Sequence, residues 1–216
     1  MMNNKPSTLA APDFVIVSSP RSGTHFLESA LASHPRIHGR GECVLRFCRS
    51  LAPPSKYVFI NKPGHLNGAI VMYAQIRDFE QMFGSIHEFK AIHLLRNPRD
   101  AALSRAQKES DRKLMGAKYK AHRRMQEGPQ QHTSISAERV NEFYEKIKKD
   151  QEVFRKFIEG HPNLLEVTYE DLTNNSQVHK LAEEPARRLL SFLGVPYKSL
   201  TTTLRKTAPS VYKFDR

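Results

Sequence analysis

A short polar segment between two apolar runs has the residue types to bind an anion. Residues 17–24 read Val-Ser-Ser-Pro-Arg-Ser-Gly-Thr and lie where a predicted strand passes into a predicted helix. The first backbone N–H groups of a helix have no partner within it, and the helix dipole adds partial positive charge there. Gly23 allows an anion to approach the backbone closely, and the hydroxyls of Ser22 and Thr24 add donors. Arg21 adds a bidentate cation, so the segment predicts a loop that binds a phosphate-like group.

The same segment departs from the phosphate-binding loop of nucleotide kinases, Gly-x-x-x-x-Gly-Lys-Ser/Thr. No lysine precedes Thr24, and no acidic residue ends a neighbouring predicted strand, where such enzymes hold Mg²⁺. We therefore expect arginine and backbone N–H groups to bind the anion without a metal ion. A nucleotide kinase or NTPase stays open as an alternative, which Mg²⁺-dependent ATP turnover would support.

Alternating strands and helices must position this loop. Short apolar runs bounded by turn signals predict buried strands at residues 14–18, 69–73, 91–95 and 164–168, with residues 57–60 as a further short candidate. Helices are predicted at about residues 25–33, 79–83, 98–107 and 184–193, the third with Asn97 as its N-cap and Pro98 in its first turn. Such alternation predicts an α/β fold with a central, mostly parallel sheet flanked by helices. The 216 residues suffice for a single domain, 1–216, with residues 1–12 as a flexible N-terminus.

A long helical stretch separates the last two predicted strands, and we expect residues 105–160 to form a helical insertion. Its apolar residues recur at a spacing of 3.6 and predict a core-facing amphipathic helix: Val140, Phe143, Tyr144, Ile147, Phe154, Phe157 and Ile158. Residues 105–124 contain eight basic residues against Glu109 and Asp111. This basic run is either a solvated face or a binding surface for an acidic acceptor.

The composition restricts the class of protein. Lys and Arg exceed Asp and Glu by 12, which implies an anionic partner such as nucleic acid, an acidic glycan, a nucleotide or an anionic membrane surface. No window approaches the run of about 18–20 apolar residues that a membrane span needs, and the N-terminus has no apolar core of a secretory signal. Two cysteines, Cys43 and Cys48, are too few for a disulfide framework and are not spaced as a zinc site. We expect a cytoplasmic, reduced protein.

A non-enzymatic nucleic-acid-binding module would also explain the charge. However, the basic residues are not interleaved with aromatic residues, the chain has no tryptophan, and no recognition motif occurs. We therefore expect no nucleic-acid partner. A gel shift that persists above about 200 mM salt would support the opposite view.

Three runs of sequence resemble one enzyme family. PRSGTHFLESALASHPRIHGRGE (residues 20–42) resembles the 5′-phosphosulfate loop, helix and following segment of sulfotransferases that use 3′-phosphoadenosine 5′-phosphosulfate (PAPS). The similarity is greatest to the bacterial carbohydrate sulfotransferases of the nodulation-factor type, and tyrosylprotein sulfotransferases show a like spacing. AIHLLRNPRDAALS (residues 91–104) resembles the family's 3′-phosphate element, and VTYEDL and FLGVP follow in the family's order. The resemblance implies the P-loop-like sulfotransferase fold.

The resemblance also implies which residues hold the donor. The 5′-phosphosulfate would be bound by Arg21, Ser22, Gly23, Thr24 and His25. The 3′-phosphate would be bound by Arg96 and Ser104, and Tyr169 would lie near the adenine. Two alternatives stay open: an ion pair of Arg96 with Asp100, and a simple helix-surface hydroxyl at Ser104.

A general base must remove the proton of the acceptor hydroxyl as its oxygen attacks sulfur. The resemblance points to Glu42, and the glycines of residues 39–42 predict a turn that carries it toward the carboxyl end of the sheet. His38 and His25 are the alternatives, since histidine is the commoner general base.

Related enzymes place a lysine where charge develops on the leaving group. Nodulation-type enzymes carry it in the strand that matches residues 68–73, and this chain has Ile70 there. Lys62, in Asn-Lys-Pro, resembles the lysine-proline element of other branches. It either takes the role of the missing strand lysine, as a catalytic residue together with Glu42 and Arg21, or is a surface lysine.

The resemblance therefore implies metal-independent transfer of a sulfuryl group from PAPS to a hydroxyl, with 3′,5′-adenosine bisphosphate (PAP) as product. The expected acceptor is a carbohydrate, such as a cell-surface or capsular polysaccharide or a glycolipid. A degenerate sulfotransferase that binds the nucleotide without turnover is also open, given Ile70. No sequence feature identifies the sulfated hydroxyl or the oligomeric state.

Overall fold

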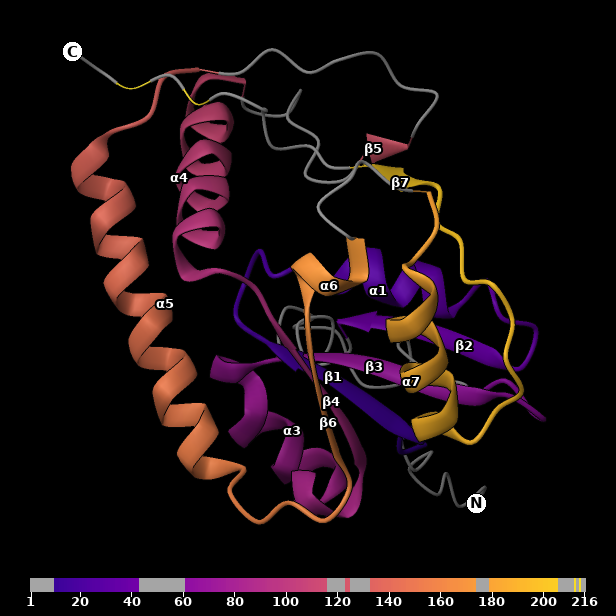
Figure 1. Cartoon of the computed structure of the whole chain (residues 1–216). Coiled ribbons are helices and arrows are strands. Elements are labelled where there is room, and N and C mark those ends of the chain that lie inside the picture. Colours follow the sequence, from indigo (N-terminus) through magenta and orange to yellow (C-terminus); the bar gives the residue numbers. More distant parts are fainter. Residues whose placement is uncertain are drawn as a thin grey trace, which may run out of the picture.

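Five parallel strands form the central sheet, in the order β2–β3–β1–β4–β6 (Figure 1). The structure, a computed structural model, describes residues 10–42, 61–115, 123–124, 133–173 and 179–205, with Tyr212 and Phe214. The sheet strands are β1 (Phe14–Ser18), β2 (Ile37–Glu42), β3 (Leu66–Met72), β4 (Lys90–Leu95) and β6 (Leu164–Thr168). A separate antiparallel pair joins β5 (Arg123–Arg124) and β7 (Leu204–Arg205). The prediction of an α/β fold with a parallel sheet is confirmed.

Helices connect the strands and cover the sheet. They are α1 (Thr24–Leu31), α3 (Ile76–Phe83), α4 (Pro98–Met115), α5 (Ala137–Phe157), α6 (Tyr169–Thr173) and α7 (Glu183–Leu193), with short 3₁₀ turns at Tyr73–Gln75 and Ile86–Glu88. Asn97 caps α4 as predicted, since its Oδ1 accepts a hydrogen bond of 2.9 Å from the backbone N–H of Arg99. Within the described ranges, no helix is long and apolar enough to cross a membrane.

The sheet is buried on both faces, which explains why its inner strands are almost entirely apolar. Phe14 and Ile16 of β1 face α1 and α7, whereas Val15 and Val17 face α3 and the last turns of α5. A third apolar cluster joins α4 to α5, which lie side by side beyond the sheet in Figure 1.

The α4–α5 pair differs from the sequence prediction in two details. Helix α4 continues to Met115 rather than ending near residue 107. Small residues such as Ala102 and Ala106 allow its first half to pack closely on the apolar face of α5. Its polar second half is held by buried side chains instead: Nε2 of Gln107 donates to the carbonyl oxygen of Thr133 at 2.7 Å, and Oδ1 of Asp111 accepts from the backbone N–H of Thr133 at 3.0 Å. Phe157, predicted in the core stripe of α5, is 40% exposed and packs its ring against His87 instead.

The other predicted strands and helices are found within a few residues of their expected bounds, but β2 corrects one prediction. Residues 39–42 form the second half of this strand rather than a turn. The register between β2 and β3 shifts between Gly39 and Glu42, where Gly41 adopts a φ of 71°. A Cβ on Gly39 would lie 2.7 Å from Cγ of Glu28, so this glycine allows α1 to approach β2 closely. The short strand expected at residues 57–60, most of the N-terminus 1–12, and Cys43 and Cys48 lie outside the described residues.

All five strands are parallel, so their carboxyl ends meet at one edge of the sheet. The loop at residues 19–23 follows β1, Glu42 ends β2, Arg96 follows β4 and Tyr169 follows β6. This is the edge at which open α/β sheets bind their ligands.

Candidate functional site

The loop at residues 19–23 has a strained, tightly packed backbone. Arg21 has a φ of 72° and Gly23 a φ of 95°, both in the left-handed region. Such a conformation costs a residue with a side chain about 1–3 kcal/mol and is concentrated at functional sites. A Cβ on Gly23 would lie 2.3 Å from Cδ2 of Tyr169, so both the backbone angle and the available space require glycine. Within the loop, the hydroxyls of Ser19 and the fully buried Ser22 lie 2.8 Å apart.

The loop contacts the segment predicted to hold the second phosphate. Nε of Arg21 donates a hydrogen bond of 3.2 Å to Oγ of Ser104, and Nη1 of Arg96 donates one of 2.9 Å to the carbonyl oxygen of Arg21. Ser104 is 3% exposed, so the alternative of a helix-surface hydroxyl is wrong. Two elements about 80 residues apart in the chain are therefore in direct contact.

Arg96 has donor capacity left over. Its guanidinium is buried and lies 4.9 Å from the ring centroid of Tyr169, yet its Nε has no hydrogen-bond partner among the residues that the structure describes. The ring of Tyr169 packs edge-on against Phe26 at 5.6 Å, and burial raises the pKa of its hydroxyl. A buried guanidinium N–H without an acceptor fits a bound anionic oxygen, as on a phosphate group.

Glu42 forms a pair with His25 at the end of β2. Nε2 of His25 lies 3.1 Å from Oε1 of Glu42, and Nδ1 lies 3.8 Å from Oε2 of Glu28. Oε1 of Glu28 in turn accepts a hydrogen bond from the backbone N–H of Gly41. The imidazole therefore lies between two carboxylates, and the side chains of His25 and Glu42 remain 31% and 21% exposed.

The structure does not bring Lys62 or His38 to this edge. Lys62 is exposed and precedes the amino end of β3, where its backbone N–H donates to Oδ1 of Asn67 at 2.8 Å. Seven strand residues separate the two edges of the sheet by roughly 20 Å. His38 lies in the amino half of β2, beside Asn67, and its pKa is lowered by burial and then by the charges of Lys62 and His65.

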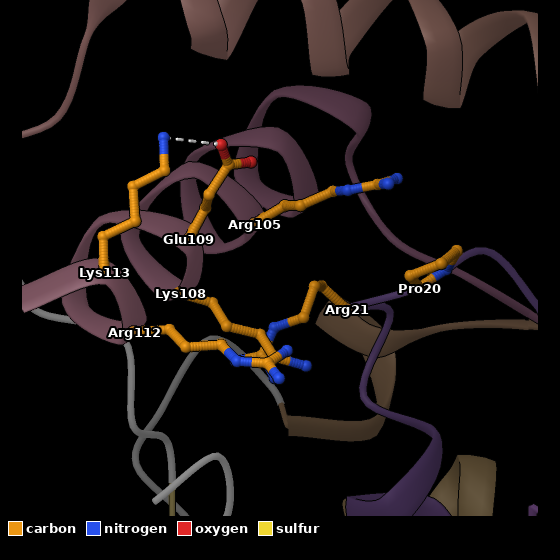
Figure 2. A pocket seen from close by; sticks show the side chains of 7 residues that line it. All are labelled: Pro20, Arg21, Arg105, Lys108, Glu109, Arg112 and Lys113. Carbon is orange, nitrogen blue, oxygen red and sulfur yellow. Dashed lines mark ion pairs between the residues drawn. The ribbon is translucent and has the colours of Figure 1, made fainter. Parts of the chain in front are cut away.

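A basic pocket lies next to the loop. The sequence indicates a solvated face or a binding surface at residues 105–124 but does not predict a pocket. It has a volume of about 530 Å³ and is lined by Pro20, Arg21, Arg105, Lys108, Glu109, Arg112 and Lys113 (Figure 2). Five of the seven residues come from α4, within the basic run whose role the sequence left open. The missed signal is the spacing of Ser104, Lys108 and Arg112 at intervals of four, which places them on one helix face.

No group of three or more His, Cys, Asp or Glu side chains that could hold a metal ion occurs within the described ranges. Independence from metal ions stays a prediction.

Comparisons with known proteins identify relatives. A sequence model of the sulfotransferase domain matches residues 79–215, more than half of the chain. The solved structure of a sulfotransferase from Alicyclobacillus acidocaldarius has a TM-score of 0.56 and 14% identity, covering 90% of this chain and 85% of its own. The sulfotransferase domain from the curacin biosynthetic pathway has a TM-score of 0.54 and 16% identity, with coverages of 87% and 76%. Mouse sulfotransferase SULT7A1, solved in complex with PAP, has a TM-score of 0.52 and 19% identity, with coverages of 89% and 62%. No curated protein sequence matches the chain.

Proposed function

The chain belongs to the sulfotransferase family, and we propose that it transfers a sulfuryl group to a hydroxyl of a carbohydrate. The family takes this group from PAPS, and the mouse relative was solved with PAP. A carbohydrate acceptor, in a polysaccharide or a glycolipid, is supported by the similarity of residues 20–42 to bacterial carbohydrate sulfotransferases.

The donor-binding part of the proposal depends on one observation, the contact between the β1–α1 loop and α4. Arg21 bonds to Ser104, and Arg96 bonds to the backbone of Arg21, so two anion-binding elements lie side by side. The loop N–H groups with Ser22 and Thr24 would hold the 5′-phosphosulfate. The unpartnered Nε of Arg96, together with Ser104, would hold the 3′-phosphate. A ligand with anionic groups at both ends of an adenosine suits this spacing.

Tyr169 is proposed to lie on the adenine side of the nucleotide. Its ring packs against Gly23 on one side, and the guanidinium of Arg96 lies over the ring. Tyr169 therefore contacts residues of both predicted phosphate sites. This contact also keeps Arg96 in place, because a cation over an aromatic face is stabilised electrostatically.

Glu42 is proposed as the general base. PAPS, when bound, supplies the electrophilic sulfur and a nucleotide leaving group. Glu42 would take up the proton of the acceptor hydroxyl, and His25 orients its carboxylate through the bond of 3.1 Å. Arg21 and the loop N–H groups would stabilise the charge that develops on the leaving oxygen, a role for which the position of Lys62 gives no support.

A nucleotide titration tests the donor site. By mass action, PAP at a hundredfold excess over its Kd should stabilise the protein by about 2.7 kcal/mol. AMP lacks the 3′-phosphate and should raise the melting temperature far less. Equal shifts from the two nucleotides would remove the assignment of Arg96 and Ser104 to the 3′-phosphate.

A panel of neutral and acidic oligosaccharides with PAPS as donor tests the acceptor. Transfer to none of them would overturn the carbohydrate proposal.

A further inference from the structure

The basic pocket on α4 has more cationic groups than the donor site accounts for. We propose that this pocket binds an anionic group of the acceptor, a carboxylate or sulfate ester on an acidic glycan; the proposal rests on the proposed carbohydrate sulfotransferase function. The pocket is called the α4 pocket below, and its seven lining residues are those given above.

Three cations converge in the α4 pocket. In Figure 2 the side chains of Lys108 and Arg112 extend from α4 toward that of Arg21. Burial lowers the pKa of Lys108, the charge of Arg21 lowers it further, and Arg112 and Arg105 act in the same direction. Gathered positive charge of this kind is unfavourable by itself and becomes favourable when an anion binds among the cations.

The acidic residue of the pocket does not neutralise this group. Glu109 forms an ion pair of 3.1 Å with Lys113 at the outer end and also accepts hydrogen bonds from Arg139 of α5. Its carboxylate is therefore engaged with Lys113 and Arg139. Lys108 and Arg112 remain as the two α4 cations that point toward Arg21.

The outer part of the pocket lies beyond the proposed donor contacts. Arg112 is eight residues after Ser104, which is about 12 Å along the helix axis. Ser104 is buried against Arg21, whereas Arg112 is exposed at the mouth. The phosphosulfate and the 3′-phosphate of the donor have the loop and the pair Arg96 and Ser104 as partners. The side chain of Arg112 extends back toward Arg21, but neither donor group needs it as a partner, so it is available to a second molecule.

The position of the pocket relative to Glu42 identifies that molecule as the acceptor. Arg21 lines the pocket, and His25, four residues later in the chain, lies 3.1 Å from Glu42; the carboxylate of Glu42 also raises the pKa of Lys108. An acceptor with its hydroxyl at Glu42 could place an anionic group of the same or a neighbouring sugar at Lys108 and Arg112. Six of the seven residues that line the pocket are charged, and five of these are cations, which suits the anionic group of an acidic glycan.

A matched pair of acceptors tests the inference. One is a neutral oligosaccharide, and the other is the same oligosaccharide with a primary hydroxyl oxidised to a carboxylate. The variant is Arg112→Gln, with Arg112→Lys as the conservative rescue and Arg77→Gln, an exposed arginine of α3, as the charge-matched control. The readouts are KM and kcat for each acceptor and, separately, the Kd of PAP.

We expect the wild-type protein to prefer the oxidised acceptor, chiefly through KM. Arg112→Gln should raise that KM by roughly tenfold, as expected for the loss of one charge-assisted hydrogen bond, while Arg112→Lys recovers part of it. The Kd of PAP and the behaviour of Arg77→Gln should stay unchanged. Equal KM values for the two acceptors in the wild type would overturn the inference. A matching loss of PAP affinity in Arg112→Gln would assign the pocket to the donor instead.

A third acceptor separates the inference from the function on which it rests. A tyrosine peptide flanked by acidic residues is assayed beside the sugars. If only the peptide is sulfated, the carbohydrate proposal and the acidic glycan both fail. If neutral and oxidised sugars are sulfated with equal KM values, the carbohydrate proposal stands and only the inference about the α4 pocket fails.

Discussion

Two histidine–glutamate pairs in this molecule have the same chemistry but different surroundings. His25 and Glu42 lie 3.1 Å apart at the carboxyl edge of the sheet, with side chains 31% and 21% exposed. His93 and Glu166 lie 2.9 Å apart on neighbouring strands β4 and β6, with the imidazole fully buried and the side chain of Glu166 43% exposed. The hydroxyl of Tyr73 lies 2.6 Å from the second nitrogen of His93.

The hydrogen bonds of the buried pair can be assigned from the chemistry of its members. A carboxylate only accepts, so Nδ1 of His93 donates to Glu166 and its Nε2 accepts from the hydroxyl of Tyr73. Phe154 of α5 stacks on Tyr73 at 4.6 Å, which ties the helix to the sheet. Both nitrogens of this buried imidazole are bonded to protein groups, so His93 has a structural role.

The exposed pair has a different setting. His25 and Glu42 stand beside a loop with left-handed backbone at Arg21 and near the cations of the α4 pocket. A histidine next to a glutamate is thus no sign of catalysis by itself. The two histidines differ in exposure, 31% against 0%, and His25 is the one with neighbouring groups suited to an anion. These features, and not the exposure of the glutamates, distinguish the pair proposed to move a proton from the pair that stabilises the fold.

The largest expected effect separates the two carboxylates. Glu42→Gln keeps the size and polarity of the side chain but removes the base, so turnover should fall by about 10²–10⁴ while the Kd of PAP changes little. Glu166→Gln is the matched control and should keep its turnover per folded molecule. The measurement is steady-state transfer from PAPS together with PAP titration. Near-normal turnover in Glu42→Gln would exclude Glu42 as the base and direct the test to His25.

The sequence predicted the parts of this site that depend on local patterns. The strand at residues 14–18, the loop after it and the cap at Asn97 follow from neighbouring residues alone. The pair of His25 and Glu42 was beyond such reasoning. It exists because residues 39–42 are a strand paired with β3, although glycine and charged residues favour no strand by themselves.

Lys62 and Arg112 also show that local sequence does not determine where a side chain lies relative to the site. Lys62 was predicted in the site and lies away from it, whereas Arg112 was not singled out and lines the pocket. The Asn-Lys-Pro motif around Lys62 is local, but the register of β3 places it at the edge of the sheet away from the loop. Arg112 belongs to a run that could have been a solvated face. Hydrogen bonds of the buried Gln107 and Asp111 to Thr133, which lies 22 residues or more along the chain, hold the second half of α4 that places this side chain beside the pocket.

A smaller effect tests the structural role of the buried pair. Tyr73→Phe removes the hydroxyl that bonds to Nε2 of His93 and leaves that buried nitrogen without its partner. The free energy of unfolding should fall by about 1–3 kcal/mol, the cost of an unsatisfied buried polar group. Denaturant titration measures it, with turnover per folded molecule as the second readout. A loss of turnover without a loss of stability would assign the buried pair a part in the reaction.

The smallest expected effect is a pH dependence of stability that arises from His93. Burial lowers the pKa of His93 and outweighs the opposing effect of Glu166, so the folded protein keeps the imidazole neutral to lower pH than the unfolded chain does. Below a pH of about 6.5 the unfolded chain therefore binds a proton that the folded protein does not, and stability falls as the pH falls. Between pH 6.5 and 5.5 the loss from this residue is at most about 1 kcal/mol, the value for an imidazole that stays neutral throughout in the folded protein. Burial also lowers the pKa of His38 and His161, so the wild type loses stability through these residues too.

The variant His93→Gln retains His38 and His161. Comparing its denaturation with that of the wild type at pH 6.5 and about 5.5 therefore isolates the contribution of His93. The variant should be less stable at pH 6.5 yet lose less stability on acidification than the wild type does, whereas parallel losses in the two proteins would show that His93 is protonated equally in the folded and unfolded states.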